Sequence, residues 1–398
     1  MMSKSGLIIN LSFLMRRPTG ISTYALNLLP SLSSLSPTLL TAQQIDSYSC
    51  YFIPSGQTPE QGIKGHLGRL FWTQLELPKI YQQLKSELLF SPLPEAPLYS
   101  KCRYVVMVHD LIPLRFPQPL SPLTFYFRYY VPLVLTQAEH IICNSHATAR
   151  DIANFFSIPG KKITPIPLGY DTLHFRPGFN PPQPPLVKGG CFDTPQPPFT
   201  TEGSLVPPLY KGGLGGVEND NKPPYFLYLG RHEPYKNLPR LLDAWAKISN
   251  CKEYELWLVG SYDKRYTPRL EKQVMELGLQ EQVKFLGYVT YEELPGIIKG
   301  AIALVFPSLW EGFGLPVLEA MACGTPVITS NISALPEVAA DAALLVNPYD
   351  TKEITAAMEA VSQPEMRSHL SQLSLKQASK FSWEKTGKAT VEILQRYI

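Results

Sequence analysis

Cysteine is scarce in this chain of 398 residues, and its six cysteines are scattered. They are Cys50, Cys102, Cys143, Cys191, Cys251 and Cys323. No two of them form a Cys-x-x-Cys pair, and none belongs to a cluster with histidine. This distribution argues against a structural zinc site and favours a reducing compartment.

Long apolar runs are also lacking, since no stretch approaches the roughly 20 residues that a membrane span needs. The apolar run 6–15 follows Lys4 in the manner of a signal peptide. Arg16 and Arg17 come directly after it, however, without a small-residue cleavage site. We therefore expect this run to form the first buried strand. The protein is expected to be cytoplasmic, at most peripheral on the inner face of a membrane.

Charge is modest, with 17% charged residues and a net charge of +3. No stripe of Lys and Arg and no aromatic-basic module is present, which excludes a nucleic-acid partner. Basic residues outnumber acidic ones within 1–175. This excess suits an anionic acceptor or peripheral contact with an anionic membrane surface, and ordinary surface charge explains it equally well.

The glycine fingerprint of dinucleotide-binding proteins, Gly-x-Gly-x-x-Gly, is missing from the first half, which argues against NAD. A single glycine turn, Pro18-Thr19-Gly20-Ile21, comes after the first expected strand instead. Gly20 is therefore a weak candidate for close approach of a ligand.

One segment differs in composition from the rest of the chain. Residues 178–224 are rich in Pro and Gly, and a Pro-Pro-Leu-x-Lys-Gly-Gly sequence occurs twice within them. Such a stretch buries too little apolar surface to offset its ordering entropy, so we predict a disordered insertion at a domain boundary. The predicted organisation is an N-terminal domain (1–177), this linker, a C-terminal domain (225–380) and a final helix (381–398).

The second half alternates buried β-branched runs with amphipathic helical stretches, which predicts a parallel, doubly wound sheet. The expected strands are 225–229, 255–259, 283–286, 301–306 and 326–329. The expected helices are 238–248, 267–277, 291–299, 316–322, 352–361, 365–380 and 383–397. In the less regular first half we expect strands at 7–14, 104–109 and 140–143, and helices at 22–29 and 122–136. Two α/β domains in one chain suggest a site in the cleft between them.

The most informative segment is 306–319, in which an expected strand, a glycine loop and an expected helix come one after another. Gly312 and Gly314 let a phosphate approach the backbone, and the free amides of Phe313, Gly314 and Leu315 add to the helix dipole to form an anion site. Two carboxylates bracket this site, Glu311 in the loop and Glu319 in the helix. They suit the hydroxyls on either side of a diphosphate, as in a nucleotide sugar. The alternative is an acidic loop and a surface helical glutamate.

A second strand–loop–helix segment, 229–237, carries Arg231 and Lys236, with Asn237 placed to cap the following helix. Two cations at the carboxyl end of a strand can stabilise a departing diphosphate. They can also be ordinary solvated loop residues. In the first half, His109 and Asp110 end a strand, where a histidine is as often a satisfied structural residue as a functional one.

These segments, together with 109–113 and 166–171, resemble the retaining glycosyltransferases of family 4, and the resemblance covers nearly the whole chain outside the insertion. It implies a GT-B fold, with two Rossmann-like domains facing each other across a cleft and a C-terminal helix that crosses back to the first domain. The glycine loop at 19–22 differs from the longer, glycine-rich loop common in the family.

The resemblance also implies roles for individual residues. Arg231 and Lys236 would hold the diphosphate together with the amides of Phe313, Gly314 and Leu315, and Gly20 would lie near the phosphates. Glu319 would bind the ribose, and Glu311 and His109 would contact the sugar. Val289 would lie near the base.

The predicted function is therefore retaining transfer of a hexose, mannose or glucose, without a metal ion or other cofactor. The donor would be a GDP- or UDP-sugar and the acceptor a saccharide or lipid-linked saccharide, in surface polysaccharide or glycoconjugate biosynthesis. A non-hydrolysing nucleotide-sugar epimerase and a catalytically silent carbohydrate-binding protein of the same fold remain alternatives.

Overall fold

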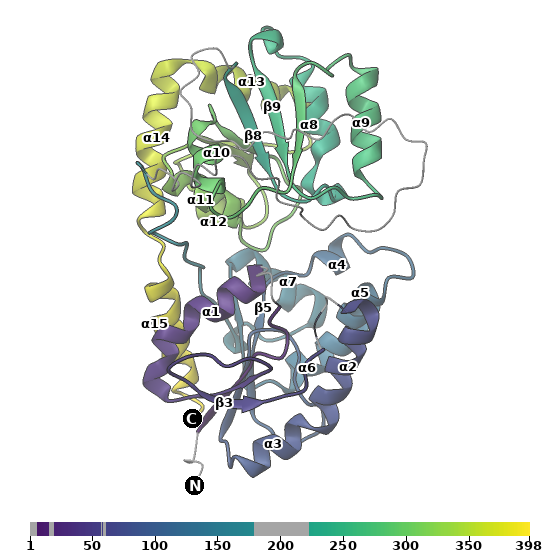
Figure 1. The fold of residues 1–398 in the computed structure, drawn as a ribbon, viewed down its shortest axis with the longest axis vertical. Coiled ribbons are helices and arrows are strands. Elements are labelled where there is room, and N and C mark those ends of the chain that lie inside the picture. Colours follow the sequence, from purple (N-terminus) through teal and green to yellow (C-terminus); the bar gives the residue numbers. More distant parts are fainter. Residues whose placement is uncertain (1–5, 16–19, 57, 59–60, 179–222) are drawn as a thin grey trace, which may run out of the picture.

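The structure is a computed structural model, and it describes residues 6–15, 20–56, 58, 61–178 and 223–398. Within these residues the chain forms two α/β domains, one above the other in Figure 1, each built on a parallel sheet. Most of the predicted insertion, 179–222, lies outside the described residues. No described helix has the length and apolar character needed to cross a membrane.

The front domain contains a seven-stranded sheet with the order β3-β2-β1-β4-β5-β6-β7. Its strands are β1 (Leu7–Asn10), β2 (Thr38–Thr41), β3 (Ser49–Phe52), β4 (Leu88–Ser91), β5 (Tyr104–Val108), β6 (His140–Cys143) and β7 (Ile163–Pro165). Successive residues of β5 point to opposite faces: Val105 and Met107 pack on one side, and Val106 and Val108 on the other. Because helices cover both faces, this strand is apolar throughout rather than alternating.

Helices pack on both faces of the front sheet. They are α1 (Gly20–Leu32), α2 (Gly62–Leu75), α3 (Leu77–Gln83), α4 (Ile112–Arg115), α5 (Pro122–Phe125), α6 (Val131–Gln137) and α7 (His146–Phe156). A π-helical turn, Tyr126–Tyr130, connects α5 to α6 and makes one continuous helical rod from 122 to 137. The N-terminal end of α1 lies at the junction between the two domains (Figure 1).

The rear domain contains a six-stranded sheet with the order β10-β9-β8-β11-β12-β13. Its strands are β8 (Tyr225–Leu229), β9 (Glu255–Val259), β10 (Val283–Gly287), β11 (Leu304–Phe306), β12 (Val327–Ser330) and β13 (Leu344–Val346). The strand order reverses between β8 and β11, and ligands of doubly wound sheets bind beyond the carboxyl ends of the strands at such a point.

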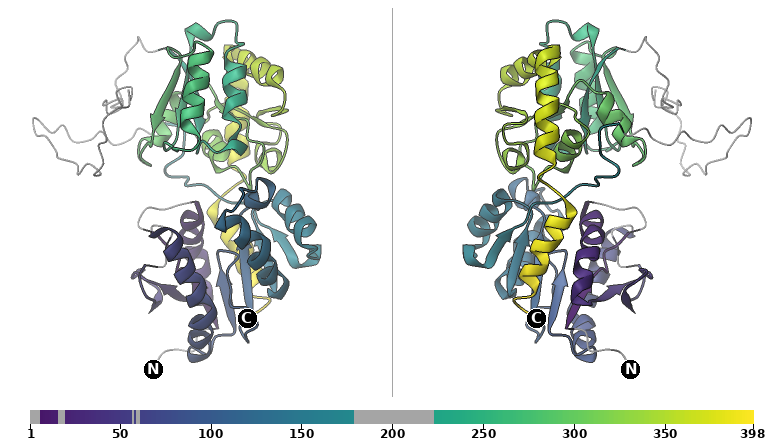
Figure 2. Two further views of the ribbon diagram at one scale, coloured as in Figure 1. Left: turned by 90° about the vertical axis from the view of Figure 1, so that its right-hand side faces the viewer. Right: turned by 90° about the vertical axis from the view of Figure 1, so that its left-hand side faces the viewer.

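The rear helices are α8 (Leu238–Trp245), α9 (Thr267–Glu276), α10 (Leu294–Gly300), α11 (Leu315–Ala322), α12 (Leu335–Ala339), α13 (Thr351–Ser362) and α14 (Pro364–Ala378). The last helix, α15 (Trp383–Leu394), leaves the rear domain and packs beside α1 of the front domain (Figures 1 and 2). Two glycines permit this close packing. A Cβ atom on Gly387 would lie 2.1 Å from the Ser31 hydroxyl, and one on Gly169 would lie 2.1 Å from the Trp383 nitrogen.

The structure confirms the doubly wound rear sheet, with β8 and β9 at the predicted residues. It adds elements that the sequence pattern did not predict: β2, β3, β4, β7 and β13, and helices α2, α3, α7 and α12. The aromatic side chains of the rod 122–137 are divided between the surface and the interior. Phe125 and Tyr129 stack on each other at the surface, whereas Tyr126 and Tyr130 are partly buried.

Candidate active site

Two loops of the rear domain meet where its strand order reverses. The loop after β8 carries Lys236, and the loop after β11 carries Glu311. The loops touch directly, since the Leu309 amide donates to the Tyr235 carbonyl at 2.7 Å. Their ends face the front domain, so residues from both domains line one interdomain site (Figure 1).

Helix α11 begins inside this site. Gly314 precedes it with φ 114°, a left-handed conformation that glycine adopts without strain, and Pro316 occupies its first turn. The amides of Val317 and Leu318 bond to the Gly314 carbonyl. Within the described chain, the amides of Phe313, Gly314 and Leu315 donate to no protein acceptor. Three free N–H groups therefore gather at the positive end of the helix.

Lys236 and Glu311 form the main ion pair of the site. The Lys236 Nζ lies 2.7 Å from Glu311 Oε1, and each side chain is only 11% exposed. The ammonium group also lies 4.9 Å from the ring centroid of Phe306 at the end of β11. Removing one partner of a buried pair leaves the other charge unpaired, so this pair fixes the positions of both loops.

Glu319 lies on the first turns of α11 and is half-buried. Burial raises the pKa of its carboxyl group from 4.5 to about 8. Burial is also the main cause of the raised pKa values of Tyr291 and Cys323, and the neighbouring Glu319 adds to both. No hydrogen bond to this carboxylate is present among the described residues. A half-buried acceptor of this kind suits a ligand that donates hydroxyl hydrogens.

The loop after β11 packs against the front domain. The hydroxyl of Ser145 donates to the Gly312 carbonyl at 2.6 Å, and that of Thr148 donates to it at 3.3 Å. A Cβ atom at position 312 would lie 2.1 Å from the His109 carbonyl oxygen. Glycine is therefore required at 312 for contact between the domains, in addition to any approach by a phosphate.

His109 and Asp110 reach the site from the end of β5. The His109 Nε2 lies 3.0 Å from the Pro92 carbonyl, which only accepts, so the proton is assigned to Nε2. Burial lowers the pKa of His109 to about 4, and the ring is neutral at pH 7. Burial raises the pKa of Asp110 to about 6, and the nearby charge of Glu311 adds to this effect. The Ile112 amide and the ammonium of Lys236 oppose it.

The side chains of Arg231 and Asn237 make contacts that the sequence did not predict. The Arg231 side chain is 74% exposed, and its Nη1 lies 3.7 Å from Glu233 Oε1. Asn237 is the N-cap residue of α8, as predicted, but it has a left-handed conformation and its side chain accepts no hydrogen bond from a helix amide. Its Nδ2 donates instead to the carbonyls of Pro307 and Pro348, and so ties two rear loops together.

Gly20 lies at the start of a front-domain helix, and Val289 lies just after a rear-domain strand. Gly20 begins α1 and is exposed, and a Cβ atom there would meet no described atom within 4 Å. Val289 comes after β10 and is half-buried against the core. The Lys236–Glu311 pair is formed without a contribution from either residue.

Several residues that shape the site were not identified from the sequence. Ser145 caps α7, since its hydroxyl accepts from the Thr148 amide, and this capping pattern was the available signal. Glu337 of α12 reaches across the domain boundary, where its carboxylate accepts from the amides of His146 and Ala147, each at 2.7 Å. These two bonds neutralise the positive end of α7 with a carboxylate from the other domain.

Trp310 forms a second link between the domains. The Arg115 guanidinium of the front domain stacks on its ring, 3.4 Å from the centroid, and also pairs with Asp151. These links hold the two domains in contact around the interdomain site.

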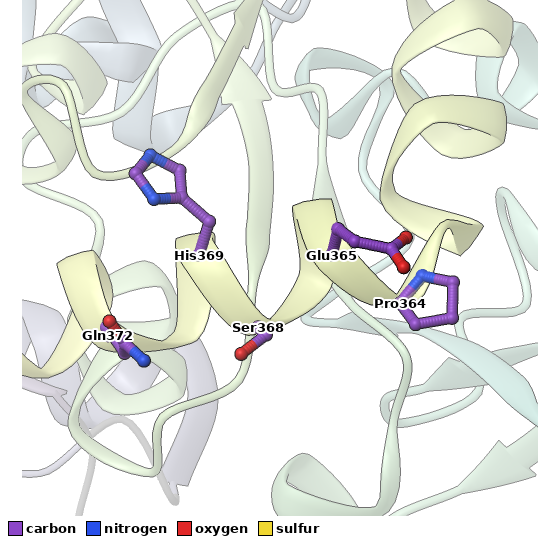
Figure 3. A pocket seen from close by; sticks show the side chains of 5 residues that line it. All are labelled: Pro364, Glu365, Ser368, His369 and Gln372. Carbon is purple, nitrogen blue, oxygen red and sulfur yellow. The ribbon is translucent and has the colours of Figure 1, made fainter.

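Other features of the surface lie away from this site. Figure 3 shows a shallow hollow lined by side chains of α14 alone, namely Pro364, Glu365, Ser368, His369 and Gln372. It contains none of the predicted site residues. In the described part of the chain, no group of three or more His, Cys, Asp or Glu side chains is arranged to hold a metal ion.

Two family models match the chain. The model described as Glycosyltransferase Family 4 matches residues 18–173, and the one described as Glycosyl transferases group 1 matches residues 216–377. Together they cover the interdomain site and every strand of the two sheets except β1.

Among characterised relatives, the O-antigen chain mannosyltransferase B of Escherichia coli is 38% identical over 169 residues, 42% of this chain. The O-antigen chain mannosyltransferase RfbU of Salmonella typhimurium is 28% identical over 259 residues, 65% of this chain. The aligned regions span 44% and 60% of these two relatives.

Solved structures share the fold over nearly the whole chain. Sucrose-phosphate synthase of Thermosynechococcus elongatus superposes with a TM-score of 0.71 at 18% identity, over 98% of each chain. HepE of Anabaena, solved with UDP-glucose, gives a TM-score of 0.69 at 15% identity, over 98% of this chain and 99% of its own. The predicted arrangement of two Rossmann-like domains, with a final helix crossing back, is thereby confirmed as the fold.

Proposed function

Because the chain belongs to the family 4 glycosyltransferases, we propose that it transfers a hexose from a nucleotide-diphosphate sugar to a saccharide or lipid-linked saccharide, with retention of the anomeric configuration. The interdomain site would bind the donor on the rear domain and the acceptor on the front domain. The epimerase and the silent binding protein that the sequence left open are alternative outcomes of the donor test.

The observation that carries this proposal is the free N-terminus of α11 beside a buried lysine. The amides of Phe313, Gly314 and Leu315 have no protein acceptor among the described residues, and a diphosphate offers oxygen acceptors of the right charge. Lys236 lies in the adjoining loop with its ammonium group fixed by Glu311. Each preorganised donor of this kind can contribute roughly 3 kcal/mol of transition-state stabilisation.

The two acidic residues would bind the hydroxyl groups on either side of the diphosphate. Glu319, with its raised pKa and unoccupied carboxylate, would accept from the ribose hydroxyls. Glu311 would accept from the hexose hydroxyls while it holds Lys236. The neutral ring of His109 would face the hexose from the front domain.

In the proposed reaction the bond between the anomeric carbon and the diphosphate oxygen breaks, and the acceptor oxygen attacks from the same face. The acceptor proton passes to a diphosphate oxygen, so no carboxylate has to act as nucleophile. Negative charge grows on the leaving diphosphate, and Lys236 with the helix start would stabilise it without a metal ion. Arg231, whose side chain is 74% exposed, would turn toward the diphosphate when the donor binds.

Mannose is the preferred candidate for the sugar. Both O-antigen relatives are named as mannosyltransferases, as is the MMP alpha-(1->4)-mannosyltransferase of Mycolicibacterium hassiacum, 28% identical over 270 residues. GDP-mannose is therefore the first donor to test and UDP-glucose the second. An acceptor for surface polysaccharide synthesis would be a saccharide carried on a lipid.

A donor panel tests the proposal. The melting temperature of the protein is measured with GDP, UDP, ADP and their sugars, since a ligand at 100 times its Kd adds about 2.7 kcal/mol of stability. The stabilising donor is then incubated with candidate acceptors, and the anomeric configuration of the product is determined by NMR. Inverted product, or absence of any stabilising nucleotide, would contradict the proposal. Formation of the C2 epimer of UDP-GlcNAc without acceptor would favour the epimerase, and binding without transfer the silent protein.

A further inference from the structure

Helix α2 of the front domain carries an apolar stripe that no other described element covers. Leu67, Phe71 and Leu75 are spaced by four residues and therefore lie on one side of the helix. They are among the exposed large hydrophobic residues, and Phe71 is 65% exposed. The opposite side of the helix is buried through Trp72 and Thr73.

The helical rod 122–137 carries a second stripe with the same spacing. Phe125, Tyr129 and Leu133 are all exposed, with Tyr129 61% exposed, while Val131 and Val134 on the other side are buried. The rings of Phe125 and Tyr129 stack at 6.1 Å between centroids. Two helices thus expose aromatic and aliphatic side chains in parallel patterns.

The two stripes belong to the same side of the domain. Gln74 of α2 donates to the Tyr130 hydroxyl at 2.9 Å, so the helices are neighbours. Trp72 and Val134 pack in the same core cluster on one face of the front sheet. Since both helices turn their buried sides to that face, their exposed sides point away from it together. Figure 1 shows α2 and α5 at the right-hand edge of the front domain, with α6 farther in.

The two helical segments that form this surface contain cations and no acids, and the exposed Glu76 that follows α2 pairs with Lys79 at 2.8 Å. Residues 61–75 and 116–137 contain no Asp or Glu. Lys64 and Arg128 are exposed on the two segments, and Arg69 is buried in a bidentate pair with Glu95. Apolar and aromatic side chains can insert into the headgroup region of a bilayer, and unpaired cations among them can bind its anionic lipids.

We propose that this surface, defined by Leu67, Phe71, Leu75, Phe125 and Tyr129, is the face by which the protein docks on an anionic membrane. A second copy of the chain fits this surface less well, because a symmetric dimer would bring cations from both copies together without acids to pair them. Ridges of two helices, rather than a groove, also favour shallow insertion between lipid headgroups over capture of a peptide. The inference concerns attachment and does not depend on the proposed transfer reaction.

Vesicle flotation of the full chain tests this inference, with vesicles of phosphatidylcholine alone or with phosphatidylglycerol. The protein should float with the anionic vesicles, and binding should weaken with added salt. Lys64→Gln and Arg128→Gln should each lower the partition coefficient about fivefold, the ratio that corresponds to about 1 kcal/mol per cation near the surface. Phe71→Ser combined with Tyr129→Ser should lower it on the order of tenfold or more.

Matched variants on the rear domain separate docking from general effects of surface change. Met275→Ser removes an apolar side chain that is 62% exposed on α9, and Lys247→Gln removes an exposed cation. Neither should change flotation, and all variants should keep the circular dichroism of the parent. Equal losses in the control variants would overturn the proposal, and so would failure of the parent chain to float at low salt. A concentration-dependent dimer that Phe71→Ser dissociates would assign the surface to self-association instead.

Discussion

Replacing Glu319 with glutamine should make the protein more stable and at the same time weaken nucleotide binding. The Glu319 carboxyl has no partner among the described residues, and burial raises its pKa from 4.5 to about 8. A folded-state pKa above the unfolded value means that the protonated group stabilises the fold below about pH 4.5. That contribution is lost as the pH rises through about 8.

The size of the effect can be derived from this shift. A rise of about 3.5 pKa units corresponds to an upper limit of about 5 kcal/mol above pH 8. Because the side chain is only half-buried, water solvates part of the charge, and we expect about 1–2 kcal/mol. Glutamine carries no charge to desolvate, so Glu319→Gln should gain this stability at pH 8 and almost none at pH 5.

Thermal melts at pH 5, 7 and 8.5 measure the pH dependence. For a domain of this size the gain should raise the melting temperature by roughly 3–6 °C at pH 8.5. The stabilisation by GDP or UDP should fall in the same variant, since hydrogen bonds to a charged group contribute about 1.5–3 kcal/mol. A variant that melts lower than the parent at pH 8.5, or a difference that does not vary with pH, would refute the assigned burial. Unchanged nucleotide stabilisation would refute the ribose contact.

Three further substitutions test the rest of the site. Lys236→Ala should lower kcat about 100-fold or more. Lys247→Ala removes an exposed cation of the same domain and should leave kcat unchanged. If the two variants had the same kcat, the diphosphate role of Lys236 would be excluded. Gly312→Ala would place a Cβ atom 2.1 Å from a front-domain carbonyl and should abolish transfer without lowering the melting temperature of the rear domain. Gly160→Ala, with no atom within 4 Å, should have no effect, and full activity of Gly312→Ala would mean that the domains do not meet in this way. Glu337→Gln weakens two charge-assisted hydrogen bonds to α7 and should shift the equilibrium between closed and open domains toward the open state by roughly tenfold. The radius of gyration measured by solution scattering should increase. An unchanged radius would argue against this link.

Local sequence determined the parts of the site that lie within one strand–loop–helix unit. The strand ending at Phe306, the glycine at 314 and the helix with Pro316 in its first turn all occur as the sequence predicts. Each depends on interactions between neighbouring residues: β-branched runs favour a strand, glycine permits a positive φ, and proline fits the start of a helix. The charged groups of the loops could therefore be assigned to one edge of the rear sheet.

Front-domain strands were harder to predict because their sequences carry little periodicity. Strands β2 and β3 are four residues long, and β3 is largely exposed at the sheet edge. A short strand of this kind is stabilised by pairing with its neighbour, so its presence depends on partners distant in the sequence.

Only the tertiary structure decided which groups meet. The pair Lys236–Glu311 joins loops 75 residues apart, and the bond from Ser145 to the Gly312 carbonyl joins residues 167 apart. Such contacts arise from the way two sheets stack their carboxyl ends against each other, and no local propensity encodes that geometry. The same packing leaves Arg231 in solvent and brings Glu337 onto α7. The sequence determined which chemistry each loop carries, and packing between the domains determined which of these groups lie together.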